Sequence, residues 1–201
     1  MRRLAKLDAL LAEAGAKHGS GLVMLCSFQK EESVLLEAVT RVAPLTRVVT
    51  IDTGVLFPET LATWREFEQR YDVHIDVEEA RGDWTGPENC CGDAKVAALE
   101  RALAGAQAWV TGLRREQSPT RARAEEVEFD ARREIPKYNP LAFWTDKDVW
   151  RVINDRDLPY NALHDNGYDS IGCATCTLPG NGRAGRWAGL DKTECGLHVA
   201  A

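Results

Sequence analysis

One stretch of the chain sets its architecture: Leu22-Val23-Met24-Leu25-Cys26-Ser27-Phe28-Gln29-Lys30-Glu31-Glu32-Ser33. Its first five residues form a short apolar run, which is typical of a buried strand. A helix is predicted from about Glu31 to Val42, because the apolar residues there recur with helical spacing. A buried strand that runs directly into a helix is the repeating unit of α/β proteins.

The same alternation continues along the chain. Further strands are expected at residues 47–51, 73–77 and 108–112, with helices at 58–67 and 91–103 between them. A short hairpin is expected at 127–135, and Thr145 with Asp148 predicts a capped helix after it. The resulting fold class is α/β, with a mostly parallel sheet and helices on both faces. We expect a single domain over residues 1–201, whose irregular C-terminal tail covers about 158–201.

Three loops follow predicted strands: Ser27 to Ser33, Asp52 to Leu56, and Gly112 to Arg123. Ligands of open parallel sheets lie beyond the carboxyl ends of the strands, so these loops predict a nucleotide site. The first loop leads into a helix N-terminus, which favours an anion, but it contains no glycine. Close cradling of a pyrophosphate generally needs glycine, so we interpret this loop as a phosphate site that no longer handles a triphosphate.

The composition is that of a soluble enzyme. The 201 residues are 44% hydrophobic and 28% charged, with a net charge of −6. That charge argues against a nucleic-acid partner, and no apolar run is long enough to span a membrane. A cytoplasmic location is therefore expected. Arginines nevertheless gather in two places, which indicates a small anionic ligand: Arg114, Arg115, Arg121 and Arg123 in one, and Arg183 and Arg186 in the other.

Six cysteines form an informative pattern. Cys90 and Cys91 are adjacent, Cys173 and Cys176 form a C-x-x-C pair, and Cys195 stands alone in the tail. Two pairs can supply four thiolates to one metal centre, leaving the tail thiol to react. A disulfide between adjacent cysteines is strained, and structural zinc usually takes two spaced pairs. A [4Fe–4S] cluster is favoured, because its irons are spread out and adjacent cysteines can bind different irons. Zinc remains the alternative metal. The sixth cysteine, Cys26, is interpreted as a small core residue.

These motifs together resemble the sulfonucleotide reductases. The matching segments, in the order that this family shows, are Ser27-Phe28, Ile51-Asp52-Thr53-Gly54, Cys90-Cys91 with Lys95, 111–118, Gly182-Arg183 with Gly185-Arg186-Trp187, and Glu194-Cys195-Gly196-Leu197-His198. The resemblance runs from about residue 20 to the end and is strongest for the assimilatory adenylyl-sulfate (APS) reductases. It implies a fold like that of the adenine-nucleotide alpha-hydrolases.

The resemblance also implies a reaction and a set of residues. Cys195 would attack the sulfur of APS, form an S-sulfocysteine and expel AMP, and thioredoxin would then release sulfite. Lys95 and one of Arg114 and Arg115 would bind the phosphosulfate. Further substrate contacts are expected from Arg183, Arg186, His198, Ser27, Asp52 and Thr53. The cluster ligands would be Cys90, Cys91, Cys173 and Cys176, in a structural and electrostatic role.

Alternative functions remain open at the level of sequence. A reductase acting on the 3′-phosphorylated substrate (PAPS), or on both substrates, would share the fold, but members dedicated to PAPS usually lack the cysteine quartet. A tRNA-thiolating enzyme would need an intact glycine-rich loop. A non-catalytic iron–sulfur or zinc module would have no use for Cys195. No fused thioredoxin-like domain follows Ala201, so the reductant is expected to be a separate protein, and homo-oligomerisation stays open.

Overall fold

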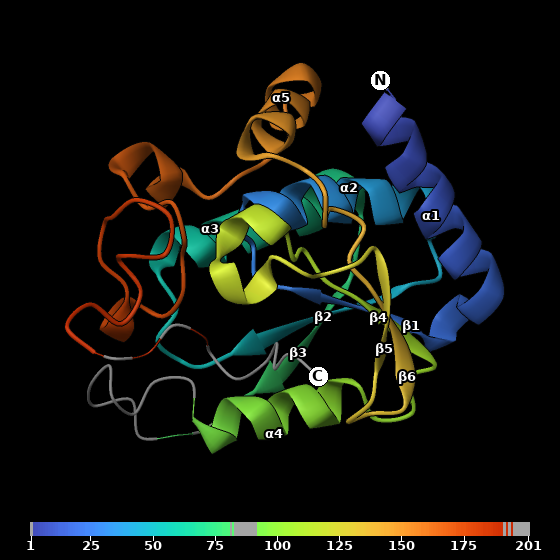
Figure 1. Ribbon diagram of the computed structural model, residues 1–201, viewed down its shortest axis with the longest axis horizontal. Coiled ribbons are helices and arrows are strands. Elements are labelled where there is room, and N and C mark those ends of the chain that lie inside the picture. The colour runs from blue at the N-terminus through green and yellow to red at the C-terminus, as the bar shows by residue number, and fades with distance from the viewer. Residues whose placement is uncertain (1, 81, 83–91, 191, 193, 195–201) are drawn as a thin grey trace.

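The computed structural model describes residues 2–80, 82, 92–190, 192 and 194. Strands and helices alternate through the first two thirds of the chain (Figure 1). The elements are α1 (Arg2–His18), β1 (Leu22–Cys26), α2 (Lys30–Val42), β2 (Arg47–Asp52), α3 (Pro58–Tyr71), β3 (Ile75–Glu79), α4 (Asp93–Ala102), β4 (Ala108–Val110), β5 (Val127–Asp130), β6 (Ile135–Tyr138) and α5 (Asp146–Arg156). The described residues after α5 form loops and short 3₁₀ turns.

The strands form one sheet in the order β3-β2-β1-β4-β6-β5. All neighbouring pairs are parallel except β5 and β6, which form the predicted hairpin and extend the sheet at one edge. The chain adds β2 and β3 on one side of β1 and then crosses to place β4 on the other side. The carboxyl ends of β1 and β4 therefore flank a topological switch point, where ligands of such sheets bind.

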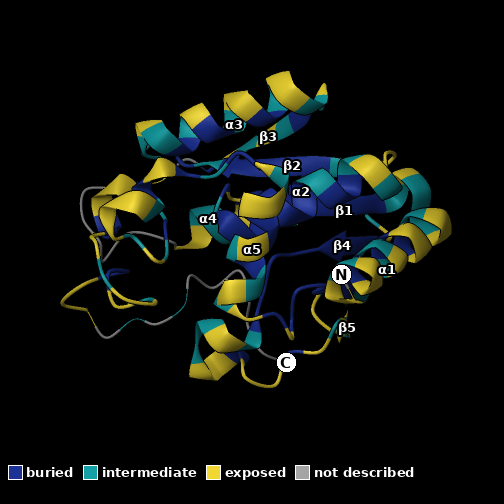
Figure 2. Cartoon of the chain, turned by 90° about the horizontal axis from the view of Figure 1, so that it is seen from above, coloured by how far each residue is buried: buried dark blue, intermediate teal, exposed yellow. Residues whose placement is uncertain are grey.

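Alternate residues of β1 serve two separate cores. Leu22, Met24 and Cys26 pack with residues of α1, α2, α3 and α5, whereas Val23 and Leu25 pack with residues of α4. This division follows from the period of two in a strand, whose side chains point to opposite faces. Figure 1 shows α4 on one side of the sheet and α1, α2 and α3 on the other, and Figure 2 shows the buried strands between them. The predicted fold class is confirmed.

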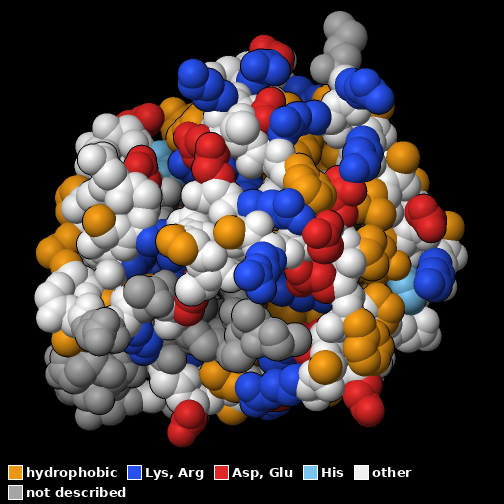
Figure 3. Space-filling view, in the orientation of Figure 1, with side chains coloured by type: hydrophobic (Ala, Val, Ile, Leu, Met, Phe, Trp, Pro, Cys, Tyr) orange, Lys and Arg blue, Asp and Glu red, His pale blue; other side chains and the backbone are white. Residues whose placement is uncertain are grey.

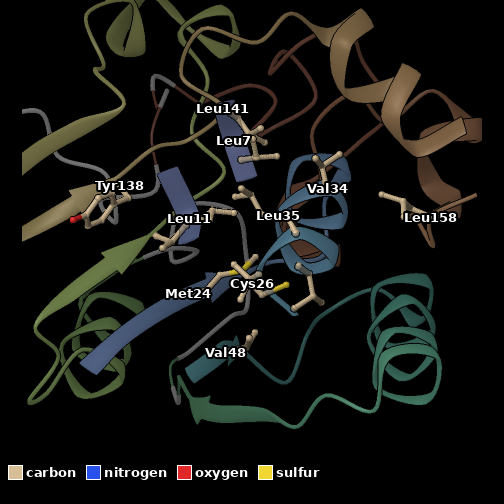
Figure 4. Close-up of a cluster of buried hydrophobic side chains, with 14 of the residues drawn as sticks. Leu7, Leu11, Met24, Cys26, Val34, Leu35, Val48, Tyr138, Leu141 and Leu158 are labelled. Carbon is tan, nitrogen blue, oxygen red and sulfur yellow. The ribbon is translucent and has the colours of Figure 1, made fainter. Parts of the chain in front are cut away.

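Cys26 belongs to the larger core, as predicted. Its side chain is 2% exposed and lies among residues such as Met24, Leu11 and Leu35 (Figure 4). Burial raises the pKa of the Cys26 thiol well above its usual value, so this thiol stays protonated at neutral pH. Cys26 is thus a core thiol and a poor nucleophile.

Most predicted elements are confirmed within two residues. Thr145 caps α5, and its Oγ1 accepts a hydrogen bond from the Asp148 amide at 3.2 Å while the Asp148 carboxylate accepts from the Thr145 amide at 3.0 Å. The third strand begins at Ile75, two residues later than predicted, because the preceding helix ends at Tyr71 with Asp72 in the left-handed region. No described helix has the length and apolar character needed to cross a membrane.

Candidate active site

A cavity of about 400 Å³ opens at the carboxyl ends of β1, β2 and β4. One wall comes from the loops that follow β1 and β4, and we call it the sheet wall; it includes residues 27, 29–32, 111–114, 116, 117 and 121. The opposite wall comes from the C-terminal loops, and we call it the tail wall; it includes residues 169–172, 182, 183 and 186. Figure 3 shows Lys and Arg side chains interleaved with Asp and Glu side chains over this face of the molecule.

The loop after β1 contains no glycine, and side-chain packing holds its conformation. Phe28 has a φ of 57°, in the left-handed region, and its buried ring stacks on Trp64 with centroids 5.6 Å apart. Gln29 caps the start of α2 with its backbone, and its Oε1 accepts a hydrogen bond from the Ile171 amide of the tail wall at 2.8 Å. Ser27 lines the cavity but does not cap the helix. The loop is therefore a fixed corner between the two walls.

Arg114 is the centre of a buried ion-pair network in the sheet wall. Its Nη2 lies 2.8 Å from Glu31 Oε1 and 3.0 Å from Asp146 Oδ1, and its Nη1 lies 3.0 Å from Glu116 Oε2. The Arg114 and Glu31 side chains are each 4% exposed. Lys30 Nζ approaches Asp146 at 2.7 Å and extends the same network. Because protein carboxylates already surround it, the Arg114 guanidinium stabilises the loop rather than offering an unpaired charge.

Arg115 points elsewhere. Its Nη2 lies 2.6 Å from Glu125 Oε1, and its guanidinium stacks over the Phe143 ring at 4.0 Å from the centroid. Arg115 does not line the cavity, whereas Arg114 does. Of this pair, Arg114 faces the cavity and Arg115 points away from it, because adjacent side chains diverge; a substrate contact of either residue stays a prediction.

Glu32 faces the cavity as a neutral acid. Burial, reinforced by the charge of Glu31, raises its pKa to about 8. Ser27 Oγ lies 3.2 Å from Glu32 Oε2, and a Cβ at Gly112 would lie only 2.5 Å from Glu32 Oε1. Glycine at position 112 is therefore required for the loop after β4 to pass this carboxyl group.

Arg186 lies in the tail wall without a carboxylate partner among the described residues. It is 7% exposed, and its Nη1 donates to the Ile171 carbonyl at 3.1 Å and to Ser170 Oγ at 3.4 Å. Its guanidinium lies over the Trp187 ring, and a Cβ at Gly172 would come within 2.5 Å of it. Its buried Nε has no hydrogen-bond acceptor in the described part of the chain. A buried cation held by neutral groups is well suited to bind an anionic ligand.

Arg121 was missed as a site residue by sequence reasoning and is central to the structure. It is 8% exposed, lines the cavity, and donates from Nε and Nη2 to Glu194 at 2.8 and 2.7 Å. The Glu194 carboxylate also accepts from Thr120 Oγ1, Ser118 Oγ and Arg183 Nη2, at 3.0, 3.2 and 3.2 Å. The clustering of arginines near residue 121 was the available signal, but its partner lies 73 residues away in sequence.

The remaining predicted site residues divide between two places. Lys95, near the start of α4, lines the cavity. Asp52 instead accepts a hydrogen bond from the Gly54 amide at 2.7 Å, and the buried Thr53 hydroxyl lies 3.3 Å from Cys173 Sγ. Neither Asp52 nor Thr53 lines the cavity, and their contact with adenosine stays a prediction.

The C-x-x-C pair is buried next to the cavity. Cys173 and Cys176 are 0% and 4% exposed and pack in the smaller core with Trp187. The other predicted ligands, Cys90 and Cys91, lie outside the described residues, as do Cys195 and His198. Among residues that the structure describes, no group of three or more His, Cys, Asp or Glu side chains is placed to hold a metal ion. The structure therefore describes two of the four thiols predicted to bind a metal.

Comparisons with known proteins agree with this geometry. The chain is 44% identical to an adenosine 5′-phosphosulfate reductase of Geobacillus kaustophilus, covering 95% of this chain and 89% of that protein. It is 43% identical to a phosphoadenosine 5′-phosphosulfate reductase of Gloeobacter violaceus, covering 96% and 88%. Among solved structures, the phosphoadenylyl-sulfate reductase of Candida auris in complex with phosphate matches with a TM-score of 0.66 and 25% identity, over 79% of this chain and 83% of that one.

The chain thus combines the reductase motifs with a mostly parallel sheet. A cavity lined by Lys and Arg side chains lies at the switch point of that sheet. The family model for the phosphoadenosine phosphosulfate reductase domain matches residues 21–179, which include the sheet wall, residues 169–172 of the tail wall and the C-x-x-C pair. The chain therefore belongs to the phosphoadenosine phosphosulfate reductase domain family, the sulfonucleotide reductases that its motifs resemble.

Proposed function

We propose that the chain reduces adenylyl sulfate to sulfite and AMP. The observation that carries this proposal is the tail wall, where Arg186 is buried in the cavity without a carboxylate partner among the described residues. Lys95 and Arg183 line the same cavity. A phosphosulfate is a compact anion, and cations held in a partly buried site bind such groups with charge-assisted hydrogen bonds. The sheet wall, with its own carboxylates, suits the uncharged nucleoside.

The chemistry divides into two balanced steps. The Cys195 thiolate attacks the sulfur of adenylyl sulfate, forming a sulfur–sulfur bond while the bond from sulfur to the phosphate oxygen breaks and AMP leaves. One thiol of a thioredoxin then attacks the Cys195 sulfur, releasing sulfite and leaving a mixed disulfide. The second thioredoxin thiol resolves that disulfide, so two thiols are oxidised and sulfur gains two electrons. We expect His198 and Arg183 to favour the Cys195 thiolate.

A [4Fe–4S] cluster held by Cys90, Cys91, Cys173 and Cys176 is part of this proposal. It would supply a fixed charge beside the cavity and would tie the segment before α4 to the tail. Lys95 follows Cys91 by four residues and lines the cavity, so it suits a position between that charge and the substrate. Zinc is the competing metal.

Metal content has a direct test. Anaerobically purified protein should be brown and contain iron and acid-labile sulfide, and Cys173→Ser should bleach it. Cys26→Ala is the matched control, because Cys26 is buried in the other core and should leave the colour unchanged. Stoichiometric zinc without sulfide would remove the cluster from the proposal.

The substrate is tested by comparing adenylyl sulfate with its 3′-phosphorylated form, with thioredoxin present, on anaerobic protein. Faster sulfite release from adenylyl sulfate supports the proposal, and a clear preference for the 3′-phosphorylated form would make the chain a PAPS reductase. The cysteine quartet favours adenylyl sulfate, although relatives of similar identity carry both names. Sulfite from neither substrate would contradict the proposal.

We also propose that the protein works in the cytoplasm, where thiols stay reduced.

A further inference from the structure

The carboxylate of Glu194 connects the two walls of the cavity. Arg121 belongs to a 3₁₀ turn (Pro119–Arg121) in the loop after β4, whereas Arg183 belongs to the tail wall, and both line the cavity. Glu194 accepts from Arg121 in a paired geometry at 2.8 and 2.7 Å and from Arg183 at 3.2 Å. Paired arginine–carboxylate hydrogen bonds fix orientation as well as distance.

Arg121, which binds the Glu194 carboxylate, is itself held in place by further hydrogen bonds. Arg121 is 8% exposed, and its remaining nitrogen, Nη1, donates to Gln117 Oε1 at 2.6 Å. Gln117 Oε1 also accepts from the Arg114 backbone amide at 3.0 Å, which joins the anchor to the buried ion-pair network of the sheet wall. The position of Glu194 is thus tied to the buried ion-pair network of Arg114.

Charge favours this arrangement over an unpaired carboxylate. Burial acts to raise the pKa of Glu194, but the Arg121 hydrogen bonds, with the charges of Arg121 and Arg183, hold that pKa below its usual range. Glu194 therefore stays ionised and bound. An ionised carboxylate alone would disfavour a neighbouring thiolate, but two guanidiniums around it leave a net positive charge.

We propose that Glu194 and Arg121 are positioning residues for the sulfur of Cys195. This inference rests on the proposed function. Consecutive α-carbons are about 3.8 Å apart, so fixing Glu194 restricts the volume that the next residue's thiol can reach. Neither residue has to touch the reacting atoms; both act through the backbone that joins positions 194 and 195. A reacting group held near its attack geometry gains rate, and a small displacement loses it.

The test compares Glu194→Gln with Glu125→Gln. The control also removes the charge of a glutamate paired with an arginine, Arg115, but on the outer surface. Reduced enzyme is mixed with adenylyl sulfate without thioredoxin, and the rate of AMP release in the first turnover is measured. The affinity for AMP and the melting temperature of each variant are measured separately. We expect first-turnover release to slow roughly ten- to a hundredfold in Glu194→Gln, with AMP affinity within about twofold, because a charge-assisted anchor is lost while the binding arginines remain.

The sign of the charge change separates positioning from thiol activation. Glu194→Gln leaves both guanidiniums in place, so the Cys195 thiol becomes no less ionised, and a slower reaction reports a misplaced sulfur. Arg121→Gln should slow the reaction similarly, and combining the two changes should add less than about twofold, because both break one contact.

Two outcomes would overturn the inference while leaving the proposed function intact. One is a first turnover in Glu194→Gln as fast as in the Glu125→Gln control. The other is tighter substrate binding with an undiminished rate, which would make Glu194 a competitor for the anion site. A wild-type enzyme that forms no adduct on Cys195 would instead remove the proposed function, and the inference with it.

Discussion

Glu32 lines the sheet wall of the cavity, whereas Glu194 joins an arginine of each wall, and the pKa values of these two acids are displaced in opposite directions. Burial raises the pKa of Glu32 to about 8, with Ser27 as its hydrogen-bond partner. Glu194 is partly buried, but Arg121 and Arg183 hold its pKa below the usual range. The sheet wall thus keeps Glu32 neutral, and the contact between the two walls keeps Glu194 ionised between two arginines.

The arginines of the two walls differ in the same way. Arg114 in the sheet wall is surrounded by Glu31, Glu116 and Asp146, whereas Arg186 in the tail wall is held by a carbonyl, a hydroxyl and an indole ring. An arginine that is paired with protein carboxylates, such as Arg114, contributes to the stability of the fold. A buried arginine without a carboxylate partner, such as Arg186, can bind an anionic ligand. The difference predicts that arginine substitutions will separate cleanly into stability effects and binding effects.

The largest expected effect is loss of stability in Arg114→Met. The substitution leaves Glu31 buried without its counter-charge, which typically costs about 3–5 kcal/mol. Urea unfolding should show this loss, and Arg114→Lys should recover part of it by keeping the charge without the fork of nitrogens. Wild-type stability in Arg114→Met would show that the network does not hold the loop.

Arg186→Gln should show the reverse behaviour. Affinity for adenylyl sulfate, measured in a Cys195→Ser background that prevents turnover, should fall ten- to a hundredfold, equivalent to about 1.5–3 kcal/mol. The melting temperature should change little, because no described carboxylate is left unpaired. A large fall in melting temperature with unchanged affinity would place Arg186 with Arg114 as a structural residue.

Glu32 makes the stability of the fold depend on pH. The folded pKa of about 8 exceeds the ordinary value of 4.5, so the folded state binds more protons between these values. Its contribution is complete below about pH 4.5 and is lost as pH rises towards 8, with a slope of at most about 1.4 kcal/mol per pH unit.

Glu32→Gln removes this dependence, so its stability relative to the wild type should increase from pH 5 to pH 8. Urea unfolding of both proteins across that range measures the difference. Parallel pH profiles would mean that Glu32 is ionised in the folded protein and that the sheet wall is more polar than its geometry indicates.

The smallest effect is expected for Arg115→Gln. Arg115 is 32% exposed and its partner Glu125 is 60% exposed, and surface pairs of this kind contribute about 0–1 kcal/mol. Melting temperature and affinity for adenylyl sulfate should both stay near the wild-type values. A loss of affinity as large as that in Arg186→Gln would return Arg115 to the binding site.

Local patterns in the sequence were enough to predict the strands, the main helices and the switch point. The buried strand β1 and the capping box at Thr145 depend on neighbours in sequence, which is why they could be predicted. The contact between Arg121 and Glu194 could not, because two ordinary charged residues meet only through the path of the tail. For the same reason, sequence reasoning placed Asp52 and Thr53 at the cavity, whereas the loop after β2 turns them towards Gly54 and Cys173.

The most direct measurement is mass spectrometry of reduced enzyme mixed with adenylyl sulfate in the absence of thioredoxin. The proposed function predicts one sulfonate adduct on Cys195, one equivalent of AMP in solution, and no adduct on the buried, protonated thiol of Cys26. Thioredoxin should then release sulfite and restore the free thiol. An adduct on any other cysteine, or sulfite formation by Cys195→Ser, would contradict a tail thiol that attacks a substrate held by the tail-wall arginines.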